Sequence, residues 1–276
     1  MSIFKTQGLK CVTFLPQVSS RMFFPLWLAL TMGVQIIPAF TNVTLNSTAR
    51  LQEFHLQQLA ILVSIIKQHI RNYVVEIFNL VTQVWTNVSL QLPIVALIEA
   101  MGKALDAEFK PFLPNVIPLV LKVFDTELNE KRVAVQMKIF DAFLTFGANI
   151  EEYLHLVIPI IVKAYERADS PPGLRKRAIQ TIDGLSRRIN FSDHASRIIH
   201  PMVRVLEGTN NELRMAVMDT LCSLVVQLGS DFAIFVPTIS KVGSPDCRKI
   251  IYSPFLSPCT AIASPTRVMR ASSRSS

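Results

Sequence analysis

The chain has 276 residues, half of which are hydrophobic, and its formal net charge at pH 7 is +8. Residues 243–276 supply +4 of that charge, with five basic residues against one acidic residue, so the rest of the chain carries too small an excess to indicate a nucleic-acid-binding surface. The four cysteines show no CxxC spacing and no histidine partners, which predicts reduced thiols in a cytosolic protein.

The first stretch of the chain combines the end of a repeat with an apolar insertion. Residues 1–18 are predicted to end one helical repeat, because Phe14-Leu15-Pro16-Gln17-Val18 resembles residues 112–116. The next comparable aromatic position, Tyr73, follows Phe14 by 59 residues, where a distance of about 40 is expected. Residues 19–37 account for the surplus, and we interpret them as an apolar insert that is foreign to the repeat.

This insert keeps a membrane-anchored repeat protein open as an alternative. No charged residue occurs from Met22 to Ala49, and the window from Met22 to Phe40 just reaches the length of a transmembrane helix. Pro25 and Pro38 lower the helix propensity of that window. The main prediction is therefore that the chain does not insert into a membrane.

Residues 38–242 contain an internal repeat with a period near 41 residues. Apolar side chains recur within it at helical spacing, as at Tyr153, Val157, Ile161 and Tyr165. A period of this length is typical of HEAT and armadillo repeats, in which each unit is a pair of antiparallel helices. The sequence therefore predicts an all-α helical-repeat solenoid of about five to six helix pairs. The expected helices cover residues 51–66, 70–84, 90–105, 111–125, 130–146, 151–167, 173–188, 194–207, 211–228 and 231–242.

Two series of residues mark the period. The first joins an aromatic or apolar residue to a proline or its equivalent six positions on, and its first members are 39, 41, 42 and 40 residues apart. We expect the prolines to kink the first helix of each pair. We expect the second series, near the start of each second helix, to bond a neighbouring repeat. The first series is Tyr73/Asn79, Phe112/Pro118, Tyr153/Pro159, Ala195/Pro201 and Phe235/Lys241, and the second is Arg50, Gln91, Arg132, Arg175 and Arg214.

No cluster of residues indicates catalysis, a cofactor or a metal ion. Asp193, His194 and His200 carry groups that metals bind, but a separation of six residues places the two histidines on different faces of a helix. Glu151 and Glu152 precede a predicted helix, where acidic side chains complement the helix dipole. We therefore predict no catalytic, cofactor-binding or metal-binding residue in this chain.

Residues 243–276 follow the last repeat. They contain eight serines and four prolines, and their apolar residues show no helical or strand period. This composition predicts a disordered tail rich in serine, proline and arginine.

Several segments are far more specific than a generic helical pattern. They include Phe14-Leu15-Pro16-Gln17-Val18, Phe146-Gly147-Ala148-Asn149, Tyr153-Leu154-His155-Leu156, Ala195-Ser196-Arg197-Ile198-Ile199-His200-Pro201 and Gln227-Leu228-Gly229. In these segments the chain resembles the helical-repeat arm that precedes the catalytic region of the target of rapamycin kinases. The resemblance covers roughly residues 4–18 and 38–242, while residues 19–37 have no counterpart in that family.

The resemblance implies a non-catalytic scaffold segment of a large serine/threonine kinase that couples nutrient and growth signals to metabolism. It implies a second kinase copy and adaptor subunits as partners. It also implies a cytoplasmic location, with peripheral attachment to lysosomal or other endomembranes through the parent complex. The chain has no glycine-rich phosphate loop, no His-Arg-Asp and no Asp-Phe-Gly, so kinase activity is not expected of it. A free-standing HEAT-repeat adaptor or cargo-binding protein is the first alternative.

Overall fold

A computed structural model of the chain describes residues 37–125 and 129–242. Within these ranges every regular element is an α-helix or a short 3-10 helix, and no described residue lies in a strand. The prediction of an all-α fold is therefore confirmed. The predicted repeat end at 1–18, most of the insert at 19–37 and the predicted disordered tail at 243–276 lie outside the described residues.

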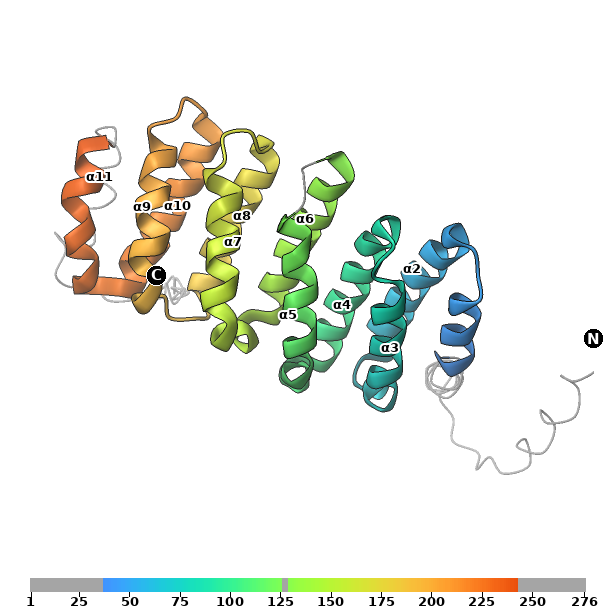
Figure 1. Ribbon diagram of the computed structural model, residues 1–276. Helices are drawn as coiled ribbons and strands as arrows, with labels where there is room; N and C mark the ends of the chain where they lie inside the picture. The colour runs from blue at the N-terminus through green and yellow to red at the C-terminus, as the bar shows by residue number, and fades with distance from the viewer. Residues whose placement is uncertain (1–36, 126–128, 243–276) are drawn as a thin grey trace, which may run out of the picture. The chain divides into compact units, whose positions relative to one another are not determined.

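The helices follow one another as pairs joined by short turns (Figure 1). Five pairs lie within the described residues and one further helix follows them, in agreement with the predicted five to six pairs. The first helix of the first pair contains residues 37–45, and Ile37 is fully buried in it, so this residue belongs to the repeat and not to the insert. The remaining helices are α2 (Ala49–Ile66), α3 (Val74–Val84), α4 (Gln91–Leu105), α5 (Leu113–Leu121), α6 (Glu130–Phe146), α7 (Leu154–Glu166), α8 (Pro172–Ser186), α9 (Ala195–Leu206), α10 (Asn211–Leu228) and α11 (Val236–Val242).

The second helices begin at residues that are well suited to a helix N-terminus. The Asn129 side chain accepts a hydrogen bond from the backbone N–H of Arg132 at 2.9 Å before α6. Asn210 accepts one from Leu213 at 3.1 Å before α10. In α8 a proline, Pro172, occupies the first position, where its missing N–H removes no helical hydrogen bond.

Four of the five described connections from a second helix to the next first helix share one conformation. They are seven-residue 3-10 segments, Lys67–Tyr73, Asp106–Phe112, Gly147–Tyr153 and Gly229–Phe235, and each begins with a residue at positive φ, between 48° and 54°. The α-helices starting after these segments were expected at residues 70, 111, 151 and 231, which are too early. The apolar spacing of a 3-10 turn resembles that of an α-helix, so the sequence pattern does not separate the two.

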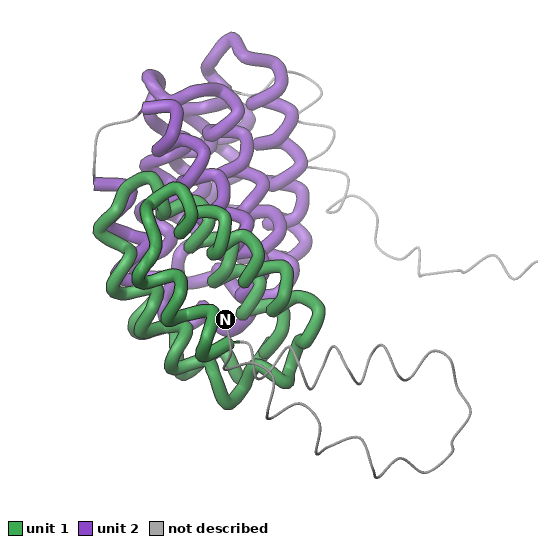
Figure 2. Tube along the Cα trace, turned by 90° about the vertical axis from the view of Figure 1, so that its right-hand side faces the viewer, with its two compact units in different colours: residues 1–116 green, residues 117–276 purple. Residues whose placement is uncertain are grey.

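The chain forms two compact units, residues 1–116 and 117–276, coloured green and purple in Figure 2. In the described part of the first unit, α2 packs on α4, and the rings of Phe78 and Phe112 stack with centroids 5.1 Å apart. In the second unit, α6, α8 and α10 form a layer of second helices, and α7 and α9 pack in a layer of first helices. Each unit therefore has its own apolar core, built from first and second helices.

Packing on several sides explains why the helices are so apolar. In α9, Ile198, Ile199 and Met202 are fully buried, and such side chains each contribute about 1.5–3 kcal/mol to stability. Two stretches, Val88–Asp125 and Asn211–Lys241, are long and apolar enough to cross a membrane by length and composition alone. Each contains a second helix, its 3-10 linker and the next first helix, and 67% of the most apolar window in the first stretch is buried inside the fold. Stacking of helix pairs therefore accounts for the apolar composition of the first stretch.

Candidate interaction surfaces

Two residues of the series near the start of the second helices, Gln91 and Arg175, bond the first helix of their own pair, and Gln52 does so in the first pair. The acceptor is a backbone carbonyl near the end of that first helix, where such oxygens lack a helical partner. The bonds run from Gln52 Nε2 to Thr44 at 3.1 Å, from Gln91 Nε2 to Trp85 at 3.3 Å, and from Arg175 Nε to Tyr165 at 2.8 Å.

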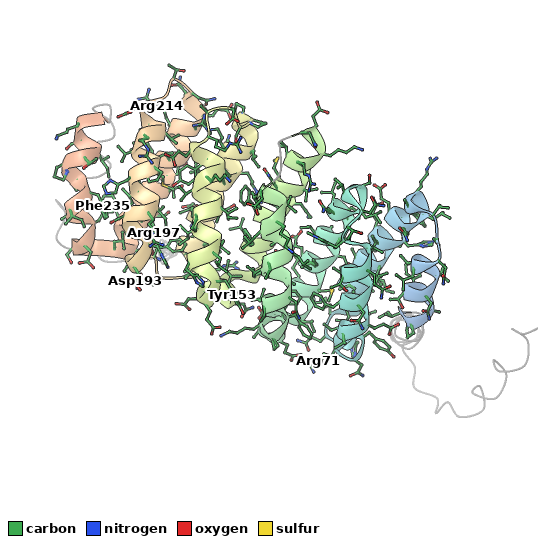
Figure 3. All side chains as sticks on the ribbon, viewed as in Figure 1. Arg71, Tyr153, Asp193, Arg197, Arg214 and Phe235 are labelled. Carbon is green, nitrogen blue, oxygen red and sulfur yellow. The ribbon has the colours of Figure 1, made fainter. Side chains whose placement is uncertain are left out.

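This geometry corrects two expectations about the series. Arg175 bonds its own pair and not a neighbouring repeat, and in the first pair the bonding residue is Gln52, two positions after Arg50. Arg50 is exposed on the first turn of α2. At Arg132 and Arg214 the backbone N–H groups bond oxygens of the residues that immediately precede α6 and α10, Asn129 and Asn210. Figure 3 places Arg214 at the start of α10.

The three predicted prolines all lie inside first helices, Pro118 in α5, Pro159 in α7 and Pro201 in α9. Pro118 and Pro159 are exposed, whereas Pro201 is buried. The difference in burial comes from a shift of one residue along the helix. Pro201 is seven positions after the last residue of the 3-10 segment that precedes its helix, whereas Pro118 and Pro159 are each six positions after the corresponding residue. The exposed His200 occupies the place that corresponds to Pro118 and Pro159.

Polar side chains join neighbouring pairs along the second helices of the second unit. Arg177 of α8 donates through Nε to Asp141 of α6 at 2.7 Å, and its Nη2 forms an ion pair with the same carboxylate. Ser223 of α10 donates to Asp183 of α8 at 2.5 Å. These partners are 36 and 40 residues apart, so each bond spans about one repeat.

The connection between α8 and α9 lacks the positive-φ turn of the other linkers. Instead, a side chain of the next pair, α9 and α10, forms hydrogen bonds with its backbone. Gln227 of α10 donates through Nε2 to the carbonyl oxygens of Ser186 and Ile189, the latter at 2.6 Å. Its Oε1 accepts a hydrogen bond from the backbone N–H of Phe191 at 3.2 Å. One amide side chain therefore satisfies three backbone groups of the connection.

Tyr165 joins the first helices α7 and α9. Its side chain is fully buried, and its hydroxyl donates to the carbonyl oxygen of Ile198 at 2.9 Å. Burial, with a smaller contribution from the Glu166 carboxylate, raises the pKa of Tyr165 far above its usual value, although Arg204 opposes this. The hydroxyl therefore stays protonated and keeps its bond to α9.

A groove of about 450 Å³ lies beside α7 on the first-helix side of the second unit. Its lining combines an apolar wall with a charged rim, and Figure 3 places Arg197 of that rim on α9. The lining residues are Ile158, Pro159, Val162, Lys163, Glu166, Arg167 and Arg197.

Two of the charged groups on the rim are paired with acids or bases nearby. Glu166 forms an ion pair with Arg204 of α9. Arg167 donates two hydrogen bonds to Asp169, at 3.2 and 2.7 Å, and this bonding lowers the pKa of the exposed Asp169 carboxyl. Both pairs are solvent-accessible, so their net contribution to stability is small.

The other two cations of the rim are available to a ligand. Lys163 and Arg197 are exposed, and within residues 37–125 and 129–242 neither side chain has an acidic partner. An apolar wall beside two such cations suits a peptide that carries an apolar side chain next to a carboxylate.

A second hollow, of about 310 Å³, lies on the opposite layer between α8 and α10. Lys176 of α8 and Glu212 of α10 form an ion pair beside it at 3.0 Å. Asp183 and Asp219 also line it, together with the apolar Met215 and Ala216, so the lining of this hollow is more polar than that of the groove beside α7.

The residues considered for metal binding do not come together. Asp193 and His194 lie in the short 3-10 segment before α9, whereas His200 lies in that helix with its ring 5.6 Å from the ring of Phe235. Figure 3 labels Asp193 and Phe235 at separate places on the fold. Among the described residues no group of three or more His, Cys, Asp or Glu side chains could hold a metal ion.

Comparison with known sequences gives close matches over most of the chain. It is 47% identical over 209 residues to the serine/threonine-protein kinase tor1 of Schizosaccharomyces pombe, which covers 75% of this chain. It is 37% identical over 241 residues to the serine/threonine-protein kinase TOR2 of Saccharomyces cerevisiae, and 37% identical over 240 residues to mTor of Drosophila melanogaster, each covering 87% of this chain. The chain spans about 9% of the length of each of these relatives.

Two further comparisons concern families and folds. A search against models of protein families gives no match. Among solved structures the chain resembles importin beta with a TM-score of 0.65 at 12% identity, over 79% of this chain and 30% of that protein. Importin beta is a HEAT-repeat protein, so this likeness confirms the helical-repeat solenoid fold.

Proposed function

The chain belongs to the family of target of rapamycin serine/threonine kinases, as a segment of their helical-repeat arm, and we propose that it serves there as a non-catalytic scaffold that acts through protein-protein contacts. Its use of buried surface supports this role. Most apolar side chains are buried where helix pairs pack against each other. The outer faces of the helices therefore stay accessible to partner proteins.

The observation that carries the proposal is the groove beside α7. It combines an apolar wall at Ile158, Pro159 and Val162 with the available cations of Lys163 and Arg197. We propose that a partner subunit inserts an acidic, apolar peptide segment there. A second kinase copy and adaptor subunits are the proposed partners, because the resemblance to the target of rapamycin kinases implies them.

A chimeric kinase tests the scaffold role. Residues 38–242 would replace the matched segment of the S. pombe kinase, and the chimera is expected to assemble and to phosphorylate a protein substrate. The double variant Lys163→Glu/Arg197→Glu should then reduce the recovery of at least one partner subunit several-fold, because it reverses both available charges at the groove. The matched control, Arg50→Glu/Lys131→Glu, reverses two exposed cations that do not line the groove and should leave recovery unchanged.

Two results would contradict these proposals separately. A chimera that fails to assemble before any surface substitution is made would overturn the scaffold role. Normal recovery of every partner with the groove variant would overturn the role of the groove and leave the scaffold role standing.

We also propose that the chain itself transfers no phosphate, because its sequence lacks the phosphate loop and the catalytic and metal-binding aspartates of kinases. The purified chain should bind no ATP in calorimetry and should release no labelled phosphate with magnesium and a protein substrate. ATP turnover that co-purifies with the chain through two different affinity tags would overturn this proposal.

The proposed location is the cytoplasm, with peripheral attachment to endomembranes through the parent complex. A fluorescent fusion of the chain should be recovered from a cell homogenate in the soluble fraction after alkaline carbonate extraction. Retention in the membrane pellet would instead support the membrane-anchored alternative.

A further inference from the structure

The groove beside α7 carries more positive charge than one carboxylate neutralises. Three cations line it, Lys163, Arg167 and Arg197, against the single acid Glu166. When the acid and the base that pair with Arg167 and Glu166 are counted as well, an excess of two positive charges remains. This excess belongs to Lys163 and Arg197, the two available cations of the rim.

An ion pair indicates the level of Arg197 along the groove. The first helices α7 and α9 lie side by side and run in the same direction (Figure 1), and Arg204 of α9 pairs with Glu166 of α7. Seven residues earlier, which is about two turns, the two helices have Arg197 and Pro159. Arg197 is therefore near the level of Pro159, on the opposite side of the groove.

The other available cation is one turn further along α7. Lys163 follows Pro159 by four residues, or about 6 Å along the helix axis. The two cations therefore belong to neighbouring helices and approach the groove from its two sides. An anionic group bound between them would meet the planar fork of an arginine and the point charge of a lysine.

The apolar wall lies directly beside these cations. Ile158 is buried, Pro159 is exposed and Val162 is half-buried, and all three line the groove next to Lys163. An apolar side chain placed on this wall would remove it from water. A ligand that fills the groove therefore needs an anionic group with an apolar side chain next to it.

We propose that this anionic group is a phosphate, so that the groove recognises a phosphorylated serine or threonine with apolar neighbours in a partner protein. The inference rests on the proposed use of the groove for an acidic, apolar segment, and it names the acid. A phosphorylated side chain carries about −1.5 to −2 charges at pH 7 and three acceptor oxygens, whereas a carboxylate carries one charge. The excess of two positive charges at the groove matches the phosphate better than the carboxylate.

The proposal makes docking at the groove dependent on phosphorylation of the partner. A kinase that modifies the partner segment would strengthen its binding to α7 and α9, and a phosphatase would weaken it. The change in affinity would come from the charge of the partner, because the groove itself is already formed in this chain.

Fluorescence anisotropy of labelled peptides tests the proposal with the full 276-residue chain. The probe is a pool of nine-residue peptides with phosphoserine at the centre and Leu, Ile, Met or Phe at the two positions on each side. Matched pools have glutamate or serine at the centre. The phosphoserine pool should bind about tenfold more tightly than the glutamate pool, and the serine pool should bind most weakly.

The double variant Lys163→Gln/Arg197→Gln removes both available cations and keeps polar side chains at two exposed positions, so the fold should be retained, which circular dichroism checks. Binding of the phosphoserine pool should weaken about tenfold, and binding of the glutamate pool should weaken less. The matched control, Arg50→Gln/Lys131→Gln, removes two exposed cations that do not line the groove and should leave both affinities unchanged.

Free phosphoserine is the second control, because it has the phosphate without apolar neighbours. It should displace the phosphoserine pool only at concentrations far above those of the peptides. Displacement at equal concentrations would show that the groove binds the anion alone and would overturn the recognition of a peptide.

The remaining outcomes separate this inference from the proposed use of the groove. Equal affinity for the phosphoserine and glutamate pools, with both lost in Lys163→Gln/Arg197→Gln, would overturn the preference for phosphate and leave the acidic-peptide role standing. An equal loss of binding in the control variant would show general attraction to a basic protein and would overturn the preference. Absence of binding by every pool would overturn both.

Discussion

At the scale of single residues, the second unit depends on buried and half-buried polar side chains that bond backbone groups. Tyr165 bonds the carbonyl of Ile198, and Arg175 bonds the carbonyl of Tyr165, so both donors meet near the end of α7. Such bonds contribute about 1 kcal/mol each, but a buried acceptor left without its donor costs more. These residues fix where one helix lies on the next.

The variant Tyr165→Phe should lower the free energy of unfolding by about 1 kcal/mol at pH 8, because it removes the hydrogen bond that joins α7 to the Ile198 carbonyl of α9. The folded-state pKa of Tyr165 is raised above the ordinary value of 10.0, so its neutral form stabilises the fold below pH 10 and this stabilisation is lost as pH rises. The difference between wild type and variant should therefore narrow by about 1.4 kcal/mol per pH unit above 10. Urea unfolding at pH 8 and pH 11 measures this.

Tyr153→Phe is the control for that experiment, since it removes a half-buried hydroxyl that bonds no described residue. It should change stability little at pH 8. A constant difference between Tyr165→Phe and wild type at both pH values would show that Tyr165 ionises equally in the folded and unfolded chain.

Arg175 should be replaceable by glutamine, because Gln52 and Gln91 form the equivalent bond in other pairs. Arg175→Gln is expected to change the free energy of unfolding by less than about 0.5 kcal/mol, whereas Arg175→Leu removes the donor and should cost about 1 kcal/mol. Chemical denaturation of the two variants gives the comparison. Equal losses would mean that the guanidinium charge, and not the hydrogen bond, is required.

The sequence predicted the period of these residues better than their register. Repetition near 41 residues placed Gln91 and Arg175 correctly, but it selected Arg50 where Gln52 forms the bond. It also aligned Pro201 with prolines that lie one position earlier in their helices. A period read from residue types tolerates an error of one or two positions, while helix packing does not, because one residue turns a side chain by about 100°.

At the scale of elements, the 3-10 linkers are the most regular feature of the repeat. Four of them start with a residue at φ near +50° and ψ near −125°. Two of these four residues, Lys67 and Asp106, are not glycine. This conformation suits glycine, so the non-glycine residues carry backbone strain. The sequence pattern could not predict the linkers, because Lys67 and Asp106 give no sign of a turn.

Substitutions at the first residue of a linker should change the free energy of unfolding in opposite directions, depending on whether glycine is introduced or removed. Lys67→Gly is expected to raise the free energy of unfolding by about 1 kcal/mol, because it releases the strain. Gly229→Ala should lower it by about 1–3 kcal/mol, and because no atom lies within 4 Å of the added Cβ, that loss would come from the backbone alone. Equilibrium unfolding in urea measures both, and a loss of stability in Lys67→Gly would contradict the strain argument.

At the scale of the whole molecule, stability should vary along the series of pairs. A helix in a repeat protein is stabilised mainly by its immediate neighbours, so helices with two neighbours are held more firmly than those with one. In the second unit α8 packs on both α6 and α10, whereas the main neighbours of the short α11 among the described residues are α9 and the linker before it.

Amide hydrogen exchange should therefore be slowest in α8 and clearly faster in α11, by at least tenfold in protection factor. Mass spectrometry of exchanged peptides from both helices, in one sample, makes the comparison. Equal protection would indicate that the second unit unfolds as one cooperative block.

The bonds between neighbouring pairs also have a mechanical consequence. Most of the surface between pairs is apolar and non-directional, so it permits small sliding movements. Directional resistance comes from a few polar bonds, such as Ser223 to Asp183 and Tyr165 to Ile198. A pulling load on the second unit would be divided over successive pair boundaries, and each would turn slightly before its bonds break. The unit should therefore behave as an elastic spring, which recovers its length when the load is removed.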